Sequence, residues 1–175
     1  MVQLREKDAS SREFYEIAIR VKAITEKYGL PLIINDRLDV AMAVDADGLH
    51  VGQEDLPMDV ARRLLGPEKI IGVSTATIEE AQLAEKQGAD YIGVGAMFAT
   101  PSKNEVRYVS LEGLGQIKKA VSIPVMAIGG IGESNLQGVI VAGADGVAVI
   151  SAILGQENIE EASARLFQLG WGRQK

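Results

Sequence analysis

The stretch Gly143-Ala144-Asp145-Gly146-Val147 joins an amphipathic segment to a short apolar run. A glycine at this point permits the left-handed turn in which many helices end. The Ala-Asp pair recurs in the same setting at residues 46–49 and 89–92, the second time again after a glycine. The same helix-to-strand joint is therefore used three times, and we predict a chain built of similar helix–strand units.

Short apolar runs alternate with longer amphipathic segments on both sides of these joints. The short runs are continuously apolar, which is typical of parallel strands buried on both faces. The longer segments have apolar residues at helical spacing. We predict strands at residues 2–5, 30–34, 48–52, 70–73, 91–95, 125–128 and 147–150, and helices at 10–28, 38–44, 58–65, 78–87, 111–120, 136–141 and 159–169.

Parallel strands that alternate with helices are found in two architectures, a doubly wound open sheet and a (β/α)8 barrel. Barrel units take roughly 25 residues each. Seven predicted strands and seven helices in 175 residues match that spacing. We therefore expect an α/β fold, a (β/α)8 TIM barrel that lacks its first β/α unit, in a single domain over residues 1–175.

The expected loss of a first unit has a structural consequence. A barrel closes only when its first strand pairs with its last, so the strands at 2–5 and 147–150 would each keep an unpaired edge. Such edges invite pairing with another chain. We expect either that the sequence is part of a longer chain or that a neighbouring chain fills the gap, as a homo-oligomer or by strand complementation.

Composition excludes several classes of function. The chain is 47% hydrophobic and 24% charged, within the globular range. Its 24 acidic and 18 basic residues give a net charge of −6, which argues against a nucleic-acid partner. The absence of cysteine excludes disulfides and thiol catalysis and fits a reducing cytoplasm. No uncharged apolar stretch reaches the roughly 18 residues of a membrane helix, so we expect no membrane partner.

Polar residues follow the predicted strands at their carboxyl ends, where barrels and open α/β sheets bind ligands. Gln3, Arg5 and Lys7 are spaced by two, which places all three side chains on one face of a strand. Facing a barrel interior, they would need a partner, and an anionic ligand supplies one. The alternative is an exposed edge strand with solvated charges.

Two carboxylates also follow strands, Asp36 after Asn35 and Asp55 after Gly52-Gln53-Glu54. A carboxylate pair with oxygen-rich neighbours suits Mg²⁺, which commonly binds one or two carboxylates together with phosphate oxygens. The alternative is that each aspartate caps the helix that follows it.

Gly129-Gly130 and Ile150-Ser151 follow the last two strands. Such turns let backbone N–H groups approach a phosphate at a helix N-terminus, although they also occur without a ligand. The irregular segment 99–110 adds Thr100, Ser102 and Lys103, which would otherwise belong to a solvated loop. Ser74 ends a strand and either contacts a ligand or caps a helix. His50 lies within a strand and is expected to be a packed core residue.

Six motifs occur in an order that resembles the thiamine-phosphate synthase (thiamin-phosphate pyrophosphorylase) family. The resemblance runs from residue 2 to about residue 153, nearly the whole chain. The motifs lie at residues 3–7, 34–37, 48–55, 72–74, 93–103 and 127–131.

The resemblance implies a (β/α)8 barrel and a transferase reaction. Hydroxymethylpyrimidine diphosphate and a thiazole phosphate would be joined to give thiamine phosphate and pyrophosphate. By resemblance, the pyrophosphate group would be held by Gln3, Arg5, Lys7, Asn35, Ser74 and Lys103. Mg²⁺ would be ligated by Asp36 and Asp55, and the thiazole phosphate would be held by Thr100, Ser102, Gly130, Ile150 and Ser151.

Two alternatives remain beside this function. The related thiazole tautomerase is implied to use a histidine two residues after the Ser74 position for proton transfer, whereas this chain has Ala76. A tautomerase-like isomerase is therefore disfavoured. The second alternative is a non-catalytic, truncated paralogue that binds thiamine phosphates.

Overall fold

The computed structural model describes residues 1–100 and 107–172. Within those residues, no helix is both long enough and apolar enough to cross a membrane. The chain divides into two compact units, each with parallel strands and helices. Unit 1 comprises Met1–Ser74 and Lys86–Asp90, and unit 2 comprises Thr75–Glu85 and Tyr91–Lys175.

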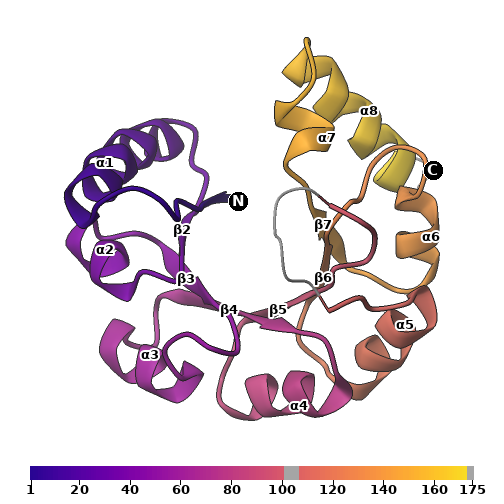
Figure 1. Ribbon diagram of the computed structural model, residues 1–175, viewed down its shortest axis with the longest axis horizontal. Helices are drawn as coiled ribbons and strands as arrows, with labels where there is room; N and C mark the ends of the chain where they lie inside the picture. Colours follow the sequence, from indigo (N-terminus) through magenta and orange to yellow (C-terminus); the bar gives the residue numbers. More distant parts are fainter. Residues whose placement is uncertain (101–106, 173–175) are drawn as a thin grey trace. The chain divides into compact units, whose positions relative to one another are not determined.

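In unit 1, the strands pair in parallel in the order in which they occur in the chain. Leu32, Ile33 and Ile34 are 0% exposed, as predicted for strands covered on both faces. The helices lie along one side of these strands (Figure 1). The elements are β1 (Val2–Leu4), α1 (Ser11–Lys27), β2 (Leu32–Asn35), α2 (Leu38–Ala43), β3 (Gly48–Val51), α3 (Met58–Leu65) and β4 (Ile70–Thr75).

Unit 2 repeats this arrangement. Its strands are parallel and follow their chain order, and α5 and α6 flank them (Figure 1). The elements of this part of the chain are α4 (Ile78–Lys86), β5 (Tyr91–Val94), α5 (Leu111–Ala120), β6 (Val125–Ile128), α6 (Leu136–Val141), β7 (Gly146–Ala148), α7 (Ser151–Leu154) and α8 (Ile159–Trp171).

All the predicted strands and helices are present, and no bound differs from its prediction by more than two residues. The expectation that β4 ends at Val73 was wrong, because the strand continues through Ser74 to Thr75. The prediction also missed α7, a four-residue helix. One turn of helix is too short to produce a recognisable apolar period.

The repeated Ala-Asp joint predicted from the sequence is confirmed, and its aspartates have a structural role. Each aspartate lies just before a strand. Its carboxylate accepts a hydrogen bond from the backbone N–H group of the first or second residue of the preceding strand. The same carboxylate pairs with a basic side chain on a nearby helix. The contacts are Asp47 with Leu32 N at 2.8 Å and Lys22 at 3.0 Å, Asp90 with Ile71 N at 2.7 Å and Arg62 at 2.5 Å, and Asp145 with Val125 N at 2.7 Å and Lys118 at 2.7 Å.

We expect Asp90→Ala to lower the free energy of unfolding by about 1–3 kcal/mol, because the N–H group of the buried Ile71 loses its acceptor. The measurement is urea denaturation of the variant and the wild type. Asp39→Ala is the matched control, since Asp39 is exposed and pairs with Arg37 on the same surface; its effect should be about 0–1 kcal/mol. Equal urea midpoints for the two variants would contradict the role assigned to Asp90.

Candidate active site

The register of unit 1 places four polar residues on one face of its sheet. Gln3 pairs with Ile33, two residues before Asn35, which itself pairs with His50. His50 in turn pairs with Gly72, two residues before Ser74. Residues in register, and residues two apart on a strand, share a face. Gln3, Asn35, His50 and Ser74 therefore project from the same face.

The predicted cationic strand ends earlier than expected, because β1 stops at Leu4 and leaves Arg5 and Lys7 just beyond it. Gln3, Arg5 and Lys7 are all exposed, and the residues between them are half-buried. The Lys7 ammonium contacts the carboxylate of Asp36 at the end of β2. The structure thus brings one predicted anion-binding residue against one predicted metal ligand.

The two predicted metal ligands act on each other electrostatically. Burial raises the pKa of Asp36 above its usual value, Lys7 opposes that rise, and the neighbouring Asp55 carboxyl adds to it. Asp36 has a left-handed backbone, with φ of 62°, and its N–H group donates to the carbonyl oxygen of His50 at 2.8 Å. Asp55 is fixed by the N–H group of Gly52, which donates to its Oδ2 at 2.8 Å.

The capping alternative for these aspartates is wrong. Helix α2 begins after Arg37 and α3 after Pro57, and neither helix start receives a hydrogen bond from a side-chain cap. The carboxylates of Asp36 and Asp55 are therefore left beside each other at the strand ends and do not serve the helices that follow them.

The Asp36–Asp55 pair fits Mg²⁺. Burial, and after it the neighbouring Asp55 carboxyl, disfavour the charged form of Asp36 and raise its pKa, so a cation shared by the two carboxylates would be stabilising. In residues 1–100 and 107–172, no group of three or more His, Asp or Glu side chains could hold a metal ion. A site with two carboxylates suits a magnesium ion that takes its remaining ligands from phosphate oxygens and water.

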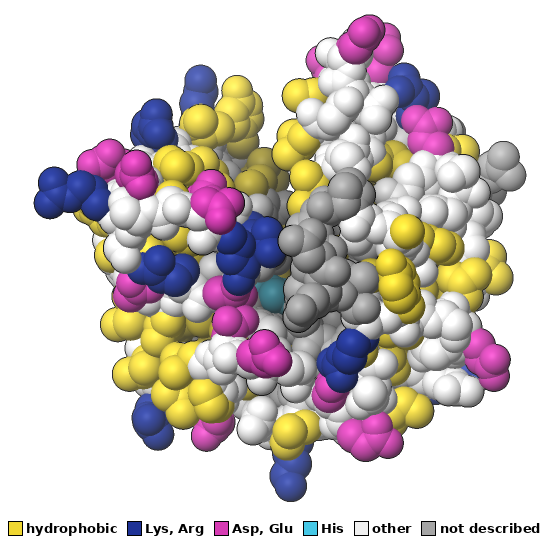
Figure 2. Space-filling view, in the orientation of Figure 1, with side chains coloured by type: hydrophobic (Ala, Val, Ile, Leu, Met, Phe, Trp, Pro, Cys, Tyr) yellow, Lys and Arg dark blue, Asp and Glu magenta, His cyan; other side chains and the backbone are white. Residues whose placement is uncertain are grey.

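Ser74 is held at two points within unit 1. Its hydroxyl lies 2.9 Å from Nε2 of His50, and its carbonyl oxygen accepts from Nε2 of Gln53 at 2.7 Å. The start of α4 is instead capped by Thr77, whose hydroxyl oxygen accepts from the N–H group of Glu80 at 3.2 Å, so the capping alternative for Ser74 is wrong. His50 is 7% exposed, as expected for a packed residue, and burial lowers its pKa to about 4. Figure 2 shows acidic and basic side chains close together near the middle of this face of the molecule. No pattern in the sequence predicts the contacts of His50 and Gln53 with Ser74.

In unit 2, the chain after β5 runs beside the end of β6. The N–H groups of Met97 and Phe98 donate to the carbonyl oxygens of Ile128 and Gly129 at 2.9 and 3.0 Å. Gly130 packs so closely there that a Cβ atom on it would lie 2.4 Å from the carbonyl oxygen of Ala99. The structure thus brings the backbone of Gly130 against the residue that precedes Thr100.

Gly130→Ala should destabilise unit 2 strongly. Its φ is +63°, which costs an alanine about 1–2 kcal/mol, and the new methyl group would overlap the Ala99 carbonyl oxygen. We expect the melting temperature to fall by several degrees, about 4 °C or more. The control is Gly132→Ala, because a Cβ atom at Gly132 has nothing within 4 Å. Equal melting temperatures for the two variants would contradict this account.

The other predicted phosphate-binding residues occupy comparable positions in unit 2. Ile128 of β6 pairs with Ala148 of β7, and Gly130 and Ile150 each lie two residues further along. Ile150 is the N-cap residue of α7, and Ser151 is its first residue; both side chains are exposed. Thr100 is half-buried. The predicted residues Ser102 and Lys103 lie outside the described residues.

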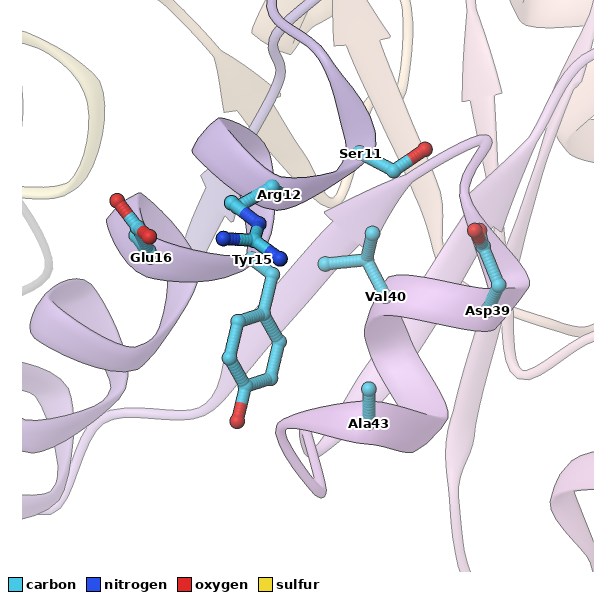
Figure 3. A pocket seen from close by; sticks show the side chains of 7 residues that line it. All are labelled: Ser11, Arg12, Tyr15, Glu16, Asp39, Val40 and Ala43. Carbon is cyan, nitrogen blue, oxygen red and sulfur yellow. The ribbon is translucent and has the colours of Figure 1, made fainter.

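A groove lies on the outer surface of unit 1, between α1 and α2 (Figure 3). It contains none of the residues predicted from the sequence to bind substrate or metal. The lining residues are Ser11, Arg12, Tyr15, Glu16, Asp39, Val40 and Ala43.

The chain is similar to a well-defined group of proteins. A family model described as thiamine monophosphate synthase matches residues 1–153. A thiamine-phosphate synthase of Alkaliphilus oremlandii is 58% identical over 166 residues, which cover 95% of this chain and 79% of that protein. The enzyme of the same name from Clostridium tetani is 55% identical over 166 residues, with the same two coverages.

A solved structure shows the fold class. The thiamine phosphate pyrophosphorylase from Pyrococcus furiosus superposes with a TM-score of 0.89 at 44% identity, covering 99% of this chain and 83% of that one. The predicted (β/α)8 barrel class, with seven strands in the described part of this chain, is thereby confirmed. With the family model and the relatives, this match shows that the chain belongs to the thiamine-phosphate synthase family.

Proposed function

We propose that the chain joins hydroxymethylpyrimidine diphosphate to a thiazole phosphate, producing thiamine phosphate and pyrophosphate. The observation that carries this proposal is the contact of Lys7 with Asp36 beside Asp55 at the strand ends of unit 1. A cation next to a carboxylate pair can bind a diphosphate together with a divalent metal ion. The relatives named thiamine-phosphate synthase, at 58% and 55% identity, support the choice of this reaction.

The diphosphate would be bound by cationic and hydrogen-bonding side chains. Arg5 and Lys7 are exposed at the end of β1, and Lys7 is within reach of the Asp36 carboxylate. The Ser74 hydroxyl would donate to a phosphate oxygen. The full set proposed for this group is Gln3, Arg5, Lys7, Asn35, Ser74 and Lys103.

Asp36 and Asp55 would hold Mg²⁺ in our proposal. When bound, the metal ion would neutralise negative charge on the diphosphate. The Asp55 carboxylate is held in place by the N–H group of Gly52. The backbone of Asp36 is held by the hydrogen bond from its N–H group to the carbonyl oxygen of His50.

The thiazole phosphate would be bound in unit 2. Close packing of Gly130 on Ala99 fixes the backbone there, and backbone N–H groups after a strand are common phosphate ligands. The residues proposed for this phosphate are Thr100, Ser102, Gly130, Ile150 and Ser151.

The reaction follows from charge stabilisation and positioning. The C–O bond of the pyrimidine substrate breaks, its electron pair leaves with pyrophosphate, and the pyrimidine methylene becomes cationic. The cationic side chains stabilise the charge that develops on the leaving group. The thiazole nitrogen then donates its electron pair to the methylene carbon and forms the new C–N bond. No protein nucleophile is needed, because bound substrates react at a high effective concentration.

Our proposal includes a cytoplasmic enzyme whose partners are small phosphorylated substrates. Both substrates carry charged phosphate groups, and moving such charges into an apolar membrane costs much free energy. An enzyme that uses them would therefore act in the compartment where they are made.

The purified chain should form thiamine phosphate and release pyrophosphate in equal amounts when both substrates and Mg²⁺ are supplied. The two products can be measured separately, thiamine phosphate by its fluorescent oxidation product and pyrophosphate by an enzyme-coupled assay. Chelation of Mg²⁺ should abolish both signals. Isomerisation of a thiazole without pyrophosphate release would instead support the tautomerase alternative, which Ala76 disfavours because its methyl group cannot transfer a proton. Substrate binding without either reaction would support a non-catalytic protein.

A further inference from the structure

His50 makes a contact that the proposed reaction does not yet use. It lies within β3, only 7% exposed, and its Nε2 atom is 2.9 Å from the hydroxyl oxygen of Ser74 on β4. Ser74 is one of the residues proposed to bind the diphosphate. Because His50 is largely covered by protein, it is placed to act on a ligand through Ser74.

The position of Ser74 is fixed from two sides. Gln53 donates to its carbonyl oxygen at 2.7 Å, while His50 contacts its hydroxyl. The backbone pairing of His50 with Gly72, two residues before Ser74, sets the imidazole on the same face as the hydroxyl. The remaining freedom of Ser74 is the direction in which its hydroxyl hydrogen points.

The tautomer of His50 decides that direction. A neutral imidazole has one N–H donor and one acceptor nitrogen. If Nε2 were the acceptor, the only hydrogen of the Ser74 hydroxyl would point at His50, and Ser74 would offer an anion only its lone pairs. If Nε2 carries the hydrogen, it donates to the Ser74 oxygen, and the hydroxyl hydrogen is available for a phosphate oxygen.

We propose that His50 is a positioning residue whose Nε2–H group donates to Ser74, so that the Ser74 hydroxyl donates to the diphosphate of the substrate. This inference rests on the proposed function, which assigns a diphosphate to Ser74. The chain of donors runs from His50 to Ser74 to a phosphate oxygen, and each hydrogen in it has one acceptor.

The tautomer can be measured directly, because His50 is the only histidine in the chain. In a sample labelled with ¹⁵N-histidine, a long-range proton–nitrogen NMR spectrum at neutral pH contains the signals of a single imidazole. We expect the pattern of a neutral ring protonated at Nε2, with and without inorganic pyrophosphate. A ring protonated at Nδ1 alone would overturn the proposal whether or not the chain is catalytically active.

A double-mutant cycle tests the link to the ligand. Inorganic pyrophosphate with Mg²⁺ is titrated into the wild type, Ser74→Ala, His50→Leu and the double variant. Ser74→Ala should weaken binding by about 10–100-fold, the range for a hydrogen bond to a charged group. His50→Leu keeps the Ser74 hydroxyl but no longer holds it, and should weaken binding by about 3–10-fold, the range for a neutral hydrogen bond. In the Ser74→Ala background, His50→Leu should weaken binding by less than about twofold, because its effect passes through Ser74. Independent effects that multiply in the double variant would overturn the proposal.

Two conservative variants separate positioning from packing. Glutamine can place an amide N–H group near the position of Nε2, whereas asparagine reaches only to the region of Nδ1. His50→Gln should therefore recover most of the pyrophosphate affinity, and His50→Asn should not. Equal affinity in these two variants, when both unfold cooperatively, would contradict the positioning role.

The same titrations distinguish failure of this inference from failure of the proposed function. If the wild type does not bind pyrophosphate in the presence of Mg²⁺, the proposed diphosphate site is wrong. The proposed hydrogen bond from the Ser74 hydroxyl to a phosphate oxygen is then wrong as well. If the wild type binds pyrophosphate but the two substitutions are not coupled, only the role of His50 is wrong.

Discussion

Asp36→Asn should reduce turnover by about 10²–10³-fold, because it removes one of the two carboxylates proposed to hold Mg²⁺. Asparagine has nearly the same shape as aspartate and tolerates the left-handed backbone at φ of 62°. The fold at the end of β2 should therefore be kept. Turnover is measured as thiamine phosphate formation at saturating substrates, and Mg²⁺ affinity by titration in the presence of pyrophosphate.

The same substitution should leave the free energy of unfolding unchanged or slightly increased. Burial and Asp55 raise the pKa of Asp36, so the folded chain holds more protons than the unfolded chain between the two pKa values. Stability therefore falls as pH rises through that window, and at neutral pH the ionised carboxylate is unfavourable. Asparagine removes that charge. Its lost ion pair with the exposed Lys7 is worth only about 0–1 kcal/mol.

The matched control is Asp39→Asn, which removes an exposed carboxylate on α2 that pairs with Arg37. It should keep wild-type turnover. Denaturation of all three proteins is measured with a chelator present, so that metal binding does not contribute to stability. Wild-type turnover in Asp36→Asn, or a large loss of stability without a change in turnover, would refute the role proposed for Asp36.

Arg5→Ala and Lys103→Ala should each lower turnover by about 10²–10³-fold, because each removes a cation proposed to stabilise the departing pyrophosphate. Arg5 is exposed just beyond β1. Its removal should therefore change the free energy of unfolding by less than about 0.5 kcal/mol. The role of Lys103 rests on the motif at residues 100–103. The free energy of unfolding of the Lys103→Ala variant is measured in the same way.

Arg63→Ala provides the control for Arg5→Ala, since Arg63 is an exposed arginine on α3 of the same unit. It removes the same charge from the chain and should leave turnover unchanged. Comparing the two variants at low and moderate salt separates a local effect from the net charge of the protein. If either Arg5→Ala or Lys103→Ala turned over substrate at close to the wild-type rate, the assignment of the pyrophosphate site would be wrong.

Local sequence determined the elements of the fold. Helices α3, α5 and α6 and strand β6 have the predicted bounds, because each combines a regular apolar pattern with a clear end signal. The Ala-Asp joints were visible as a repeat, and their aspartates do occupy equivalent positions. Helix α7 was missed, since four residues cannot display a helical period.

The sequence predicted which residues belong to the candidate site, but it did not predict which of them touch one another. Sequence motifs brought Lys7, Asp36, Asp55 and Ser74 into consideration, each with an alternative interpretation. The structure removed the capping alternative for both aspartates, because neither following helix uses a side-chain cap. Which polar side chain touches which depends on the register between strands, and one residue of slip would turn each side chain to the other face.

The sequence by itself determined the strands, the helices and the residue types available for phosphate and metal chemistry, because these depend on neighbours only a few positions away. Only the tertiary structure decided that His50 lies against Ser74, 24 residues later, and that Lys7 reaches Asp36, 29 residues later. Parallel pairing places strands from distant parts of the chain side by side, so such contacts have no local pattern. The burial that keeps His50 covered and raises the pKa of Asp36 likewise arises only when the sheet and its helices pack together.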